Sequence, residues 1–235
     1  MHPVADKLAQ HLETHDSLFF ARDDYKLETW VAVEAYCCFA ADKESEWCVN
    51  PGDLPYMTRA YAEKKKQEKW CDVYARKVVA GRAEEHLWIE FKGLPRGASK
   101  KSRAEVLKKF VEDINFLLQL DRPRTEMFWG DRRNPNTNTS QAGWFSKFAM
   151  ACKDKFKDAS PGAIEQGTFT GLAILLAACE DQRELDALAK DVRTRTDNAE
   201  IEVPQPEKVL LPRKDTGPGL GLIVYDLGKI PREVG

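Results

Sequence analysis

Two short segments decide the predicted fold: Trp70-Cys71-Asp72-Val73-Tyr74-Ala75 and Leu87-Trp88-Ile89-Glu90-Phe91-Lys92-Gly93. Their length and their content of Trp, Val, Tyr, Ile and Phe are typical of strands. The stretch between them, Ala80-Gly81-Arg82-Ala83-Glu84, indicates a turn. We therefore expect a hairpin, and both of its strands carry charged side chains where a buried strand is usually apolar.

The register of this hairpin decides which charges face each other. One register pairs Val79 with Glu85. It brings Asp72 opposite Lys92, and a slip of two residues brings Asp72 opposite Glu90 instead. Because side chains two apart on a strand share a face, Glu90 and Lys92 project together toward Asp72 in either register. The sequence predicts a cluster of two carboxylates and one lysine on a single patch of sheet.

Two carboxylates beside a lysine are a suitable site for a hard divalent cation. Magnesium takes oxygen ligands, often one or two protein carboxylates, and completes its shell with water and substrate phosphate. A neighbouring lysine can orient or deprotonate the attacking water, or neutralise charge that develops on phosphorus.

An Asp on one strand, Glu-x-Lys on the next strand and then a helix form the signature of the PD-(D/E)xK nuclease superfamily. This chain resembles that superfamily over roughly residues 22 to 120. The resemblance implies a restriction-endonuclease-like core that hydrolyses phosphodiester bonds, with DNA as the expected substrate. It implies that Asp72 and Glu90 bind Mg²⁺ or Mn²⁺, that the backbone carbonyl of Phe91 adds an oxygen ligand, and that Lys92 assists the water.

The resemblance also implies a helix with a Glu before the sheet. Residues 24–41 predict an amphipathic helix, capped by Asp23 or Asp24. Glu34 falls in the middle of its apolar stripe, and Glu28 falls at the edge. An acid that faces a core is costly unless it is paired or binds metal. We therefore take Glu34 as the helical acid, which would hold a water or a metal ion, with Glu28 in reserve.

Other elements follow from local patterns. Residues 54–69 are compatible with two structures, a strand near Met57–Ala62 or a helix capped by Asp53. Residues 169–178 are likewise compatible with a buried strand or a buried helix. The remaining expected elements are helices over 101–120, 144–157 and 181–195, a strand over 125–129, a loop over 130–143, and a terminal hairpin of 209–211 with 220–227.

A cluster of basic residues follows the proposed metal site. Six bases and one acid, Glu105, lie between Arg96 and Lys109. Basic side chains there would contact phosphates without reading bases, although a solvated helix start is the simpler alternative. The expected nucleic-acid contacts are Arg96, Lys100, Lys101 and Arg103, joined by Arg132 and Arg133 on the loop over 130–143.

Composition excludes several other classes. The formal charge of -2 gives no global basic field. None of the six cysteines forms a CxxC pair, and the four histidines lack HExxH or zinc-finger spacing, which argues against a structural zinc site. No charged-then-apolar leader opens the chain, and the longest apolar run, 172–179, is far below the ~20 residues of a membrane span. We expect a cytoplasmic, soluble protein with free cysteines and no membrane partner.

The sequence as a whole predicts one α/β domain over residues 1–235, in which helices flank a central mixed sheet. Its nuclease-like core would cover about 22–200, and a C-terminal β-hairpin about 201–235. The expected function is that of a Mg²⁺-dependent endonuclease. The sequence is compatible with a homo-oligomer as well as with a monomer. Two alternatives stay open as well: a non-cleaving nucleic-acid-binding or protein-interaction module on this scaffold, and an unrelated α/β interaction domain in which Asp72 and Lys92 form an ordinary ion pair.

Overall fold

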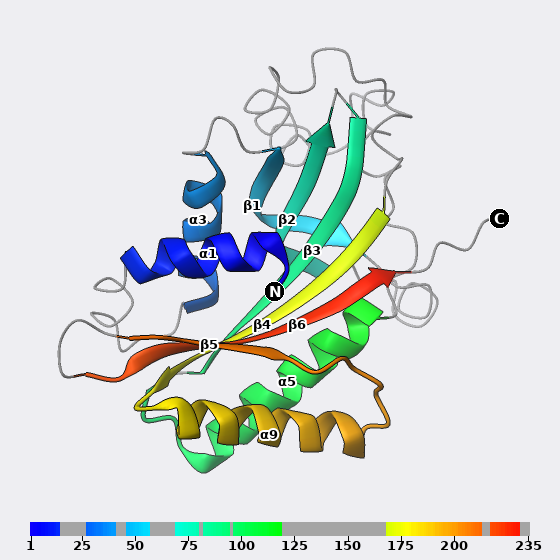
Figure 1. Cartoon of the computed structure of the whole chain (residues 1–235). Coiled ribbons are helices and arrows are strands. Elements are labelled where there is room, and N and C mark those ends of the chain that lie inside the picture. The colour runs from blue at the N-terminus through cyan, green and yellow to red at the C-terminus, as the bar shows by residue number, and fades with distance from the viewer. Residues whose placement is uncertain are drawn as a thin grey trace, which may run out of the picture.

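The computed structural model describes residues 1–14, 27–40, 46–56, 69–79, 82–94, 96–118, 168–212 and 217–230. These residues form one mixed β-sheet with helices on both faces (Figure 1). The α/β class with a central mixed sheet flanked by helices is thereby confirmed. The elements are α1 (Pro3–Thr14), α3 (Leu27–Ala40), β1 (Trp47–Tyr56), β2 (Lys69–Val79), β3 (Arg82–Leu94), α5 (Lys100–Leu118), β4 (Thr168–Cys179), α9 (Gln182–Asn198), β5 (Glu207–Leu211) and β6 (Gly219–Ile230).

The sheet has six strands in the order β1-β2-β3-β4-β6-β5. The first three strands form an antiparallel meander, and β4 then pairs with β3 in parallel. Parallel neighbours need a long crossover connection, and α5 lies in the connection between these two strands. The predicted C-terminal hairpin is confirmed as β5 paired with β6, and β6 also pairs with β4 inside the sheet.

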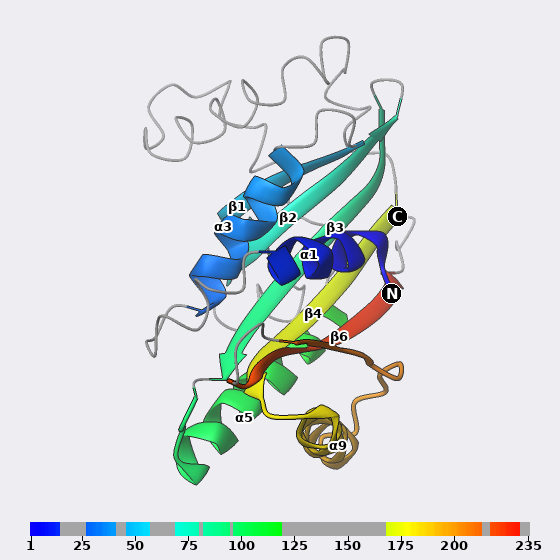
Figure 2. The ribbon, with the colours of Figure 1, turned by 60° about the vertical axis from the view of Figure 1, so that its left-hand side comes forward.

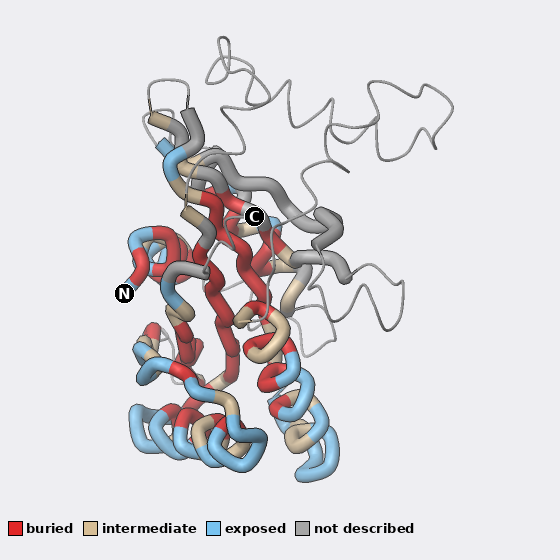
Figure 3. The backbone as a smooth tube through the Cα atoms, turned by 90° about the vertical axis from the view of Figure 1, so that its right-hand side faces the viewer, coloured by how far each residue is buried: buried red, intermediate tan, exposed pale blue. Residues whose placement is uncertain are grey.

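Two hydrophobic layers hold the sheet between the helices. One layer joins α1 and α3 to one face, and the other joins α5 and α9 to the opposite face (Figure 2). Alternate residues of β3 serve the two layers, with Ile89 and Phe91 in the first and Trp88 in the second. Burial is concentrated along the central strands, whereas α5 and α9 alternate buried and exposed residues (Figure 3).

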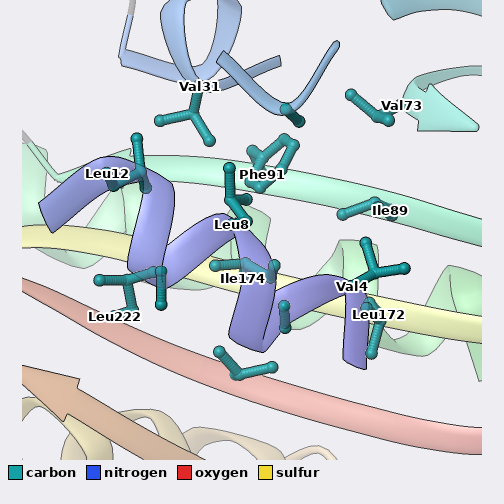
Figure 4. Packing of buried hydrophobic residues seen from close by; sticks show 14 of the residues in the cluster. Val4, Leu8, Leu12, Val31, Val73, Ile89, Phe91, Leu172, Ile174 and Leu222 are labelled. Atoms are coloured by element: carbon teal, nitrogen blue, oxygen red, sulfur yellow. The ribbon is translucent and has the colours of Figure 1, made fainter. Parts of the chain in front are cut away.

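The helix α1 lies across the middle of the sheet. Its apolar residues Val4, Leu8 and Leu12 are almost completely buried. They lie among side chains of α3 and of the central strands, including Val31 and Phe91 (Figure 4). This helix was not predicted from the sequence.

The β2–β3 hairpin forms as predicted, in the register that is slipped by two. Val73 lies opposite Ile89, so the same register continued by one residue sets Asp72 level with Glu90. The pairing of Val79 with Glu85 was wrong, because the strands continue to the tip and Val79 lies opposite Arg82.

Of residues 54–69, the structure describes 54–56 and the first residue of β2. Residues 54–56 belong to β1, so the prediction of a helix that begins after Asp53 was wrong for these residues. β1 contains Pro51 and Pro55, which a strand tolerates at the edge of a sheet, and β1 is an edge strand. Residues 57–68 lie outside the described residues, as do the elements predicted over 125–129, 130–143 and 144–157.

The remaining expectations agree with the structure to within a few residues. Residues 169–178, for which both a strand and a helix were considered, form the buried strand β4. The helices predicted over 101–120 and 181–195 are α5 and α9. Asp181 caps α9 by accepting a hydrogen bond from the Glu184 backbone N–H. None of the helices among the described residues is long and apolar enough to cross a bilayer.

Candidate functional site

The site lies where β2 and β3 stop pairing. The described ladder between them runs from Val79 to Val73, although both strands continue further. Beyond that point the Asp72 carboxylate accepts a hydrogen bond from the Phe91 backbone N–H at 2.8 Å. A side chain thus takes the place of the missing ladder partner, which fixes Asp72 at the point where the strands separate.

Glu90 and Lys92 follow on β3, on the face that carries α5. Glu90 is only 3 % exposed. The Lys92 ammonium lies 3.1 Å from Asp113 of α5 and 3.5 Å from Glu28 of α3. Since α3 and α5 cover opposite faces of the sheet, Lys92 contacts acids from both helical layers.

The structure distinguishes the two acids of α3. Glu28, in the first turn, accepts a hydrogen bond from the Gly93 backbone N–H at 3.3 Å in addition to its contact with Lys92. Glu34 lies nearly two turns further along and bonds to His11 of α1 at 2.8 Å. Glu34 therefore faces protein, as its position in the apolar stripe indicated, but His11 belongs to a helix that was not predicted. The structure brings Glu28 to Lys92 and places Glu34 between α1 and α3.

Asp113 is the member of the cluster that sequence reasoning missed. It is 8 % exposed and lies on the buried side of α5, next to Ile114. The signal was available, because Asp113 interrupts an apolar stripe in the way that drew attention to Glu34. That stripe contains Leu107, Phe110, Val111, Ile114 and Leu117.

Burial dominates the electrostatics of the two proposed ligands. It raises the pKa of Asp72 to about 6, although the Phe91 N–H and the Lys92 charge act in the opposite direction. Burial also raises the pKa of Glu90 well above its usual value, and repulsion by Asp113 adds to this effect. Both groups therefore bind a proton more readily than an exposed carboxyl group does, and a bound cation would favour their ionised forms.

Lys92 is held in its charged form. Burial alone would lower the pKa of Lys92, but attraction by Asp113 and then by Glu28 outweighs it, and the pKa is raised. The side chain is 17 % exposed. In this arrangement Lys92 can donate hydrogen bonds and stabilise negative charge, and it is poorly suited to accept a proton.

The donor set is compatible with magnesium but does not form a complete protein cage. Among the described residues, no three His, Cys, Asp or Glu side chains are grouped closely enough to hold a metal ion. Mg²⁺ is usually bound by one or two carboxylates plus water and phosphate, so Asp72 and Glu90 fit its chemistry. The Phe91 side chain is buried in the opposite layer, and the ligand role of its backbone carbonyl stays a prediction.

The basic residues lie at and before the start of α5. Arg96, Lys100 and Lys101 are exposed and Arg103 is half-buried, whereas Arg132 and Arg133 lie outside the described residues. Further along α5, both lysines pair with acids one turn away on the same helix: Lys108 with Glu112 and Lys109 with Glu105. The first turn of α5 is thus the stronger candidate for phosphate contacts.

Comparison with known proteins gives no relative. No family model matches the chain, and neither a curated protein nor a solved structure is significantly similar to it. A function for this chain therefore has to be inferred from the geometry of the site.

Proposed function

We propose that this protein is a nuclease that hydrolyses phosphodiester bonds of DNA with Mg²⁺ or Mn²⁺. The observation that carries the proposal is the separation of β2 and β3 beside Asp72, with Glu90 and Lys92 on the neighbouring strand. Glu28 from the preceding helix reaches the same lysine. The order of these residues along the chain and their positions on a mixed sheet support a restriction-endonuclease-like core.

Each residue has a separate task in the proposed reaction. Asp72 and Glu90 would hold the cation, since burial raises the pKa of both carboxyl groups and a bound cation would stabilise their ionised forms. When bound, the ion would polarise the phosphate and lower the pKa of a water molecule. Lys92 would orient that water and stabilise the charge that develops on the phosphate oxygens, because its own pKa is raised.

Substrate binding would use the start of α5. Arg96, Lys100 and Lys101 are exposed on the segment that follows Lys92 in the chain. Cations there would contact the backbone phosphates, and the positive end of the helix dipole would add to the attraction. These contacts carry no base information, so we propose no sequence preference.

One observation favours a second function, a non-cleaving module on the same scaffold. Lys92 already pairs with Asp113 and Glu28, so part of the negative charge is compensated without any metal. A structural ion cluster of this kind would leave the protein able to bind nucleic acid or another protein without cleaving it.

Cleavage assays separate the two functions. Purified protein is incubated with single-stranded, double-stranded and branched DNA in Mg²⁺, in Mn²⁺ and in chelator. We expect cleavage only with metal, and loss of it in Asp72→Asn, Glu90→Gln and Lys92→Met. Lys77→Met is the matched control, because Lys77 lies on β2 near the hairpin tip and pairs with exposed acids. Wild-type protein that cleaves none of these substrates would support the non-cleaving module.

A further inference from the structure

Asp113 is a buried carboxylate whose place on α5 is hard to explain by packing. Its neighbours Phe110, Ile114 and Leu117 are completely buried. A buried charge costs several kcal/mol unless a partner compensates it, on the order of the penalty for each ion of a buried pair. The partner is the Lys92 ammonium at 3.1 Å.

The contact with Asp113 sets the direction in which the Lys92 side chain points. Lys92 shares a face of β3 with Glu90 and has Asp72 among the charges that act on it. The flexible four-carbon stem of a lysine would let the ammonium reach either carboxylate. Asp113 on one side and Glu28 on the other instead hold the ammonium by charge.

We infer that Asp113 is a positioning residue that holds the Lys92 ammonium beside the Asp72 and Glu90 carboxylates and keeps it from occupying the place of the divalent cation. This inference rests on the proposed function. It goes beyond the resemblance, whose signature contains no acid on the helix after Glu-x-Lys. Without Asp113 the ammonium would pair with the two carboxylates and compete with the metal.

The test measures binding of Mn²⁺ alone by calorimetry, so it does not depend on cleavage. Four proteins are compared: wild type, Asp113→Asn, Lys92→Met and the double variant. We expect Asp113→Asn to weaken Mn²⁺ binding by about tenfold or more, the usual effect of removing a group that supports a metal site. In the Lys92→Met background, the same substitution should change the affinity less than about twofold, because no ammonium remains to be held. Glu112→Gln, an exposed acid one residue away, is the control and should bind like wild type.

Each outcome decides a different question. An equal loss in both backgrounds would mean that Asp113 acts only through its own charge, and the inference would be overturned while the proposed function stands. Wild-type protein that neither binds Mn²⁺ nor cleaves DNA would overturn the proposed function, and this inference with it. A loss of Mn²⁺ affinity that occurs only when Lys92 is present supports the inference.

A second variant covers the case in which Asp113→Asn does not fold. Asp113→Glu keeps the charge but moves it by one methylene. We expect it to fold and to lower kcat for DNA cleavage while KM stays near the wild-type value, since only the placement of Lys92 changes. Unchanged kcat in Asp113→Glu together with unchanged Mn²⁺ affinity would count against a positioning role.

Discussion

The two ends of the β2–β3 hairpin carry similar charges in different surroundings. Near the tip the strands stay paired as far as Val79 and Arg82, with a β-bulge between Lys77 and Val78. There Lys77 lies 3.4 Å from Glu46 and 4.0 Å from Glu84, both more than half exposed. At the open end the ladder stops at Val73, and Lys92 lies between acids that include the buried Asp113. Ion pairs in water contribute little, whereas buried charges strongly affect one another. Burial of the charges at the point where the ladder ends, and not the lysine–acid pairing itself, therefore marks the candidate site.

The largest expected effect is on cleavage. Lys92→Met should lower the rate of metal-dependent DNA cleavage by about 1000-fold, the upper range for removing one group that stabilises a transition state. Lys77→Met should leave the rate unchanged. Single-turnover cleavage of a labelled duplex measures both. Equal losses in the two variants would show that the ends of the hairpin do not differ in function.

The next effect concerns stability and pH. In the folded protein the pKa of Asp72 is about 6, above the usual value, so folding favours its protonated form. The contribution of this group to stability is therefore fully present below pH ~4 and is lost as pH rises through 6, by up to about 3 kcal/mol. Asp72→Asn should remove this part of the pH dependence, and the metal-free variant should be more stable than wild type at pH 8.

Urea unfolding of wild type and Asp72→Asn between pH 4 and pH 8 measures the difference. Saturating Mg²⁺ should restore stability to wild type at pH 8 because the cation binds the ionised carboxylate. The matched control at the other end is Glu46→Gln, which should follow the wild-type curve. Parallel curves for wild type and Asp72→Asn would contradict the burial of the Asp72 charge.

The same contrast explains what could be predicted from sequence. The hairpin and the grouping of Asp72, Glu90 and Lys92 followed from strand composition and from the two-residue period, which are local signals. The edge strand β1 was missed because Pro51 and Pro55 oppose a strand assignment unless the strand is known to lie at an edge. Whether a strand lies at the edge of a sheet depends on the strands that pair with it in the fold, and local sequence does not show this.

Two acids illustrate the same limit within the site. Glu34 and Asp113 both interrupt an apolar helical stripe, and the sequence cannot tell which acid meets the lysine. The position of α1 supplies His11 as the partner of Glu34, and the crossover of α5 supplies Asp113 to Lys92. Helix periodicity predicts that a side chain faces inward, whereas the identity of its partner is a property of the tertiary arrangement.

A smaller effect is expected at the start of α5. Replacing Lys100, Lys101 and Arg103 by Ala should weaken DNA binding about equally for unrelated sequences. The slope of log affinity against log salt should fall by up to ~0.9 for each lost phosphate contact. Fluorescence anisotropy at several salt concentrations measures both quantities. The matched control is Lys108→Ala with Lys109→Ala on the same helix, where both lysines pair with Glu residues. Identical slopes for the two variants would mean that the basic residues at the start of α5 are solvated and do not contact phosphates.

The smallest effect returns to the tip of the hairpin. Lys77→Met removes two ion pairs, but both acidic partners are more than half exposed, so the free energy of unfolding should fall by less than about 1 kcal/mol. High salt should reduce even this difference, because it screens exposed charges. Urea unfolding of wild type and Lys77→Met in low and high salt provides the measurement. A loss of several kcal/mol would mean that the tip charges are as strongly coupled as those around Lys92, and the contrast between the two ends would no longer distinguish the candidate site.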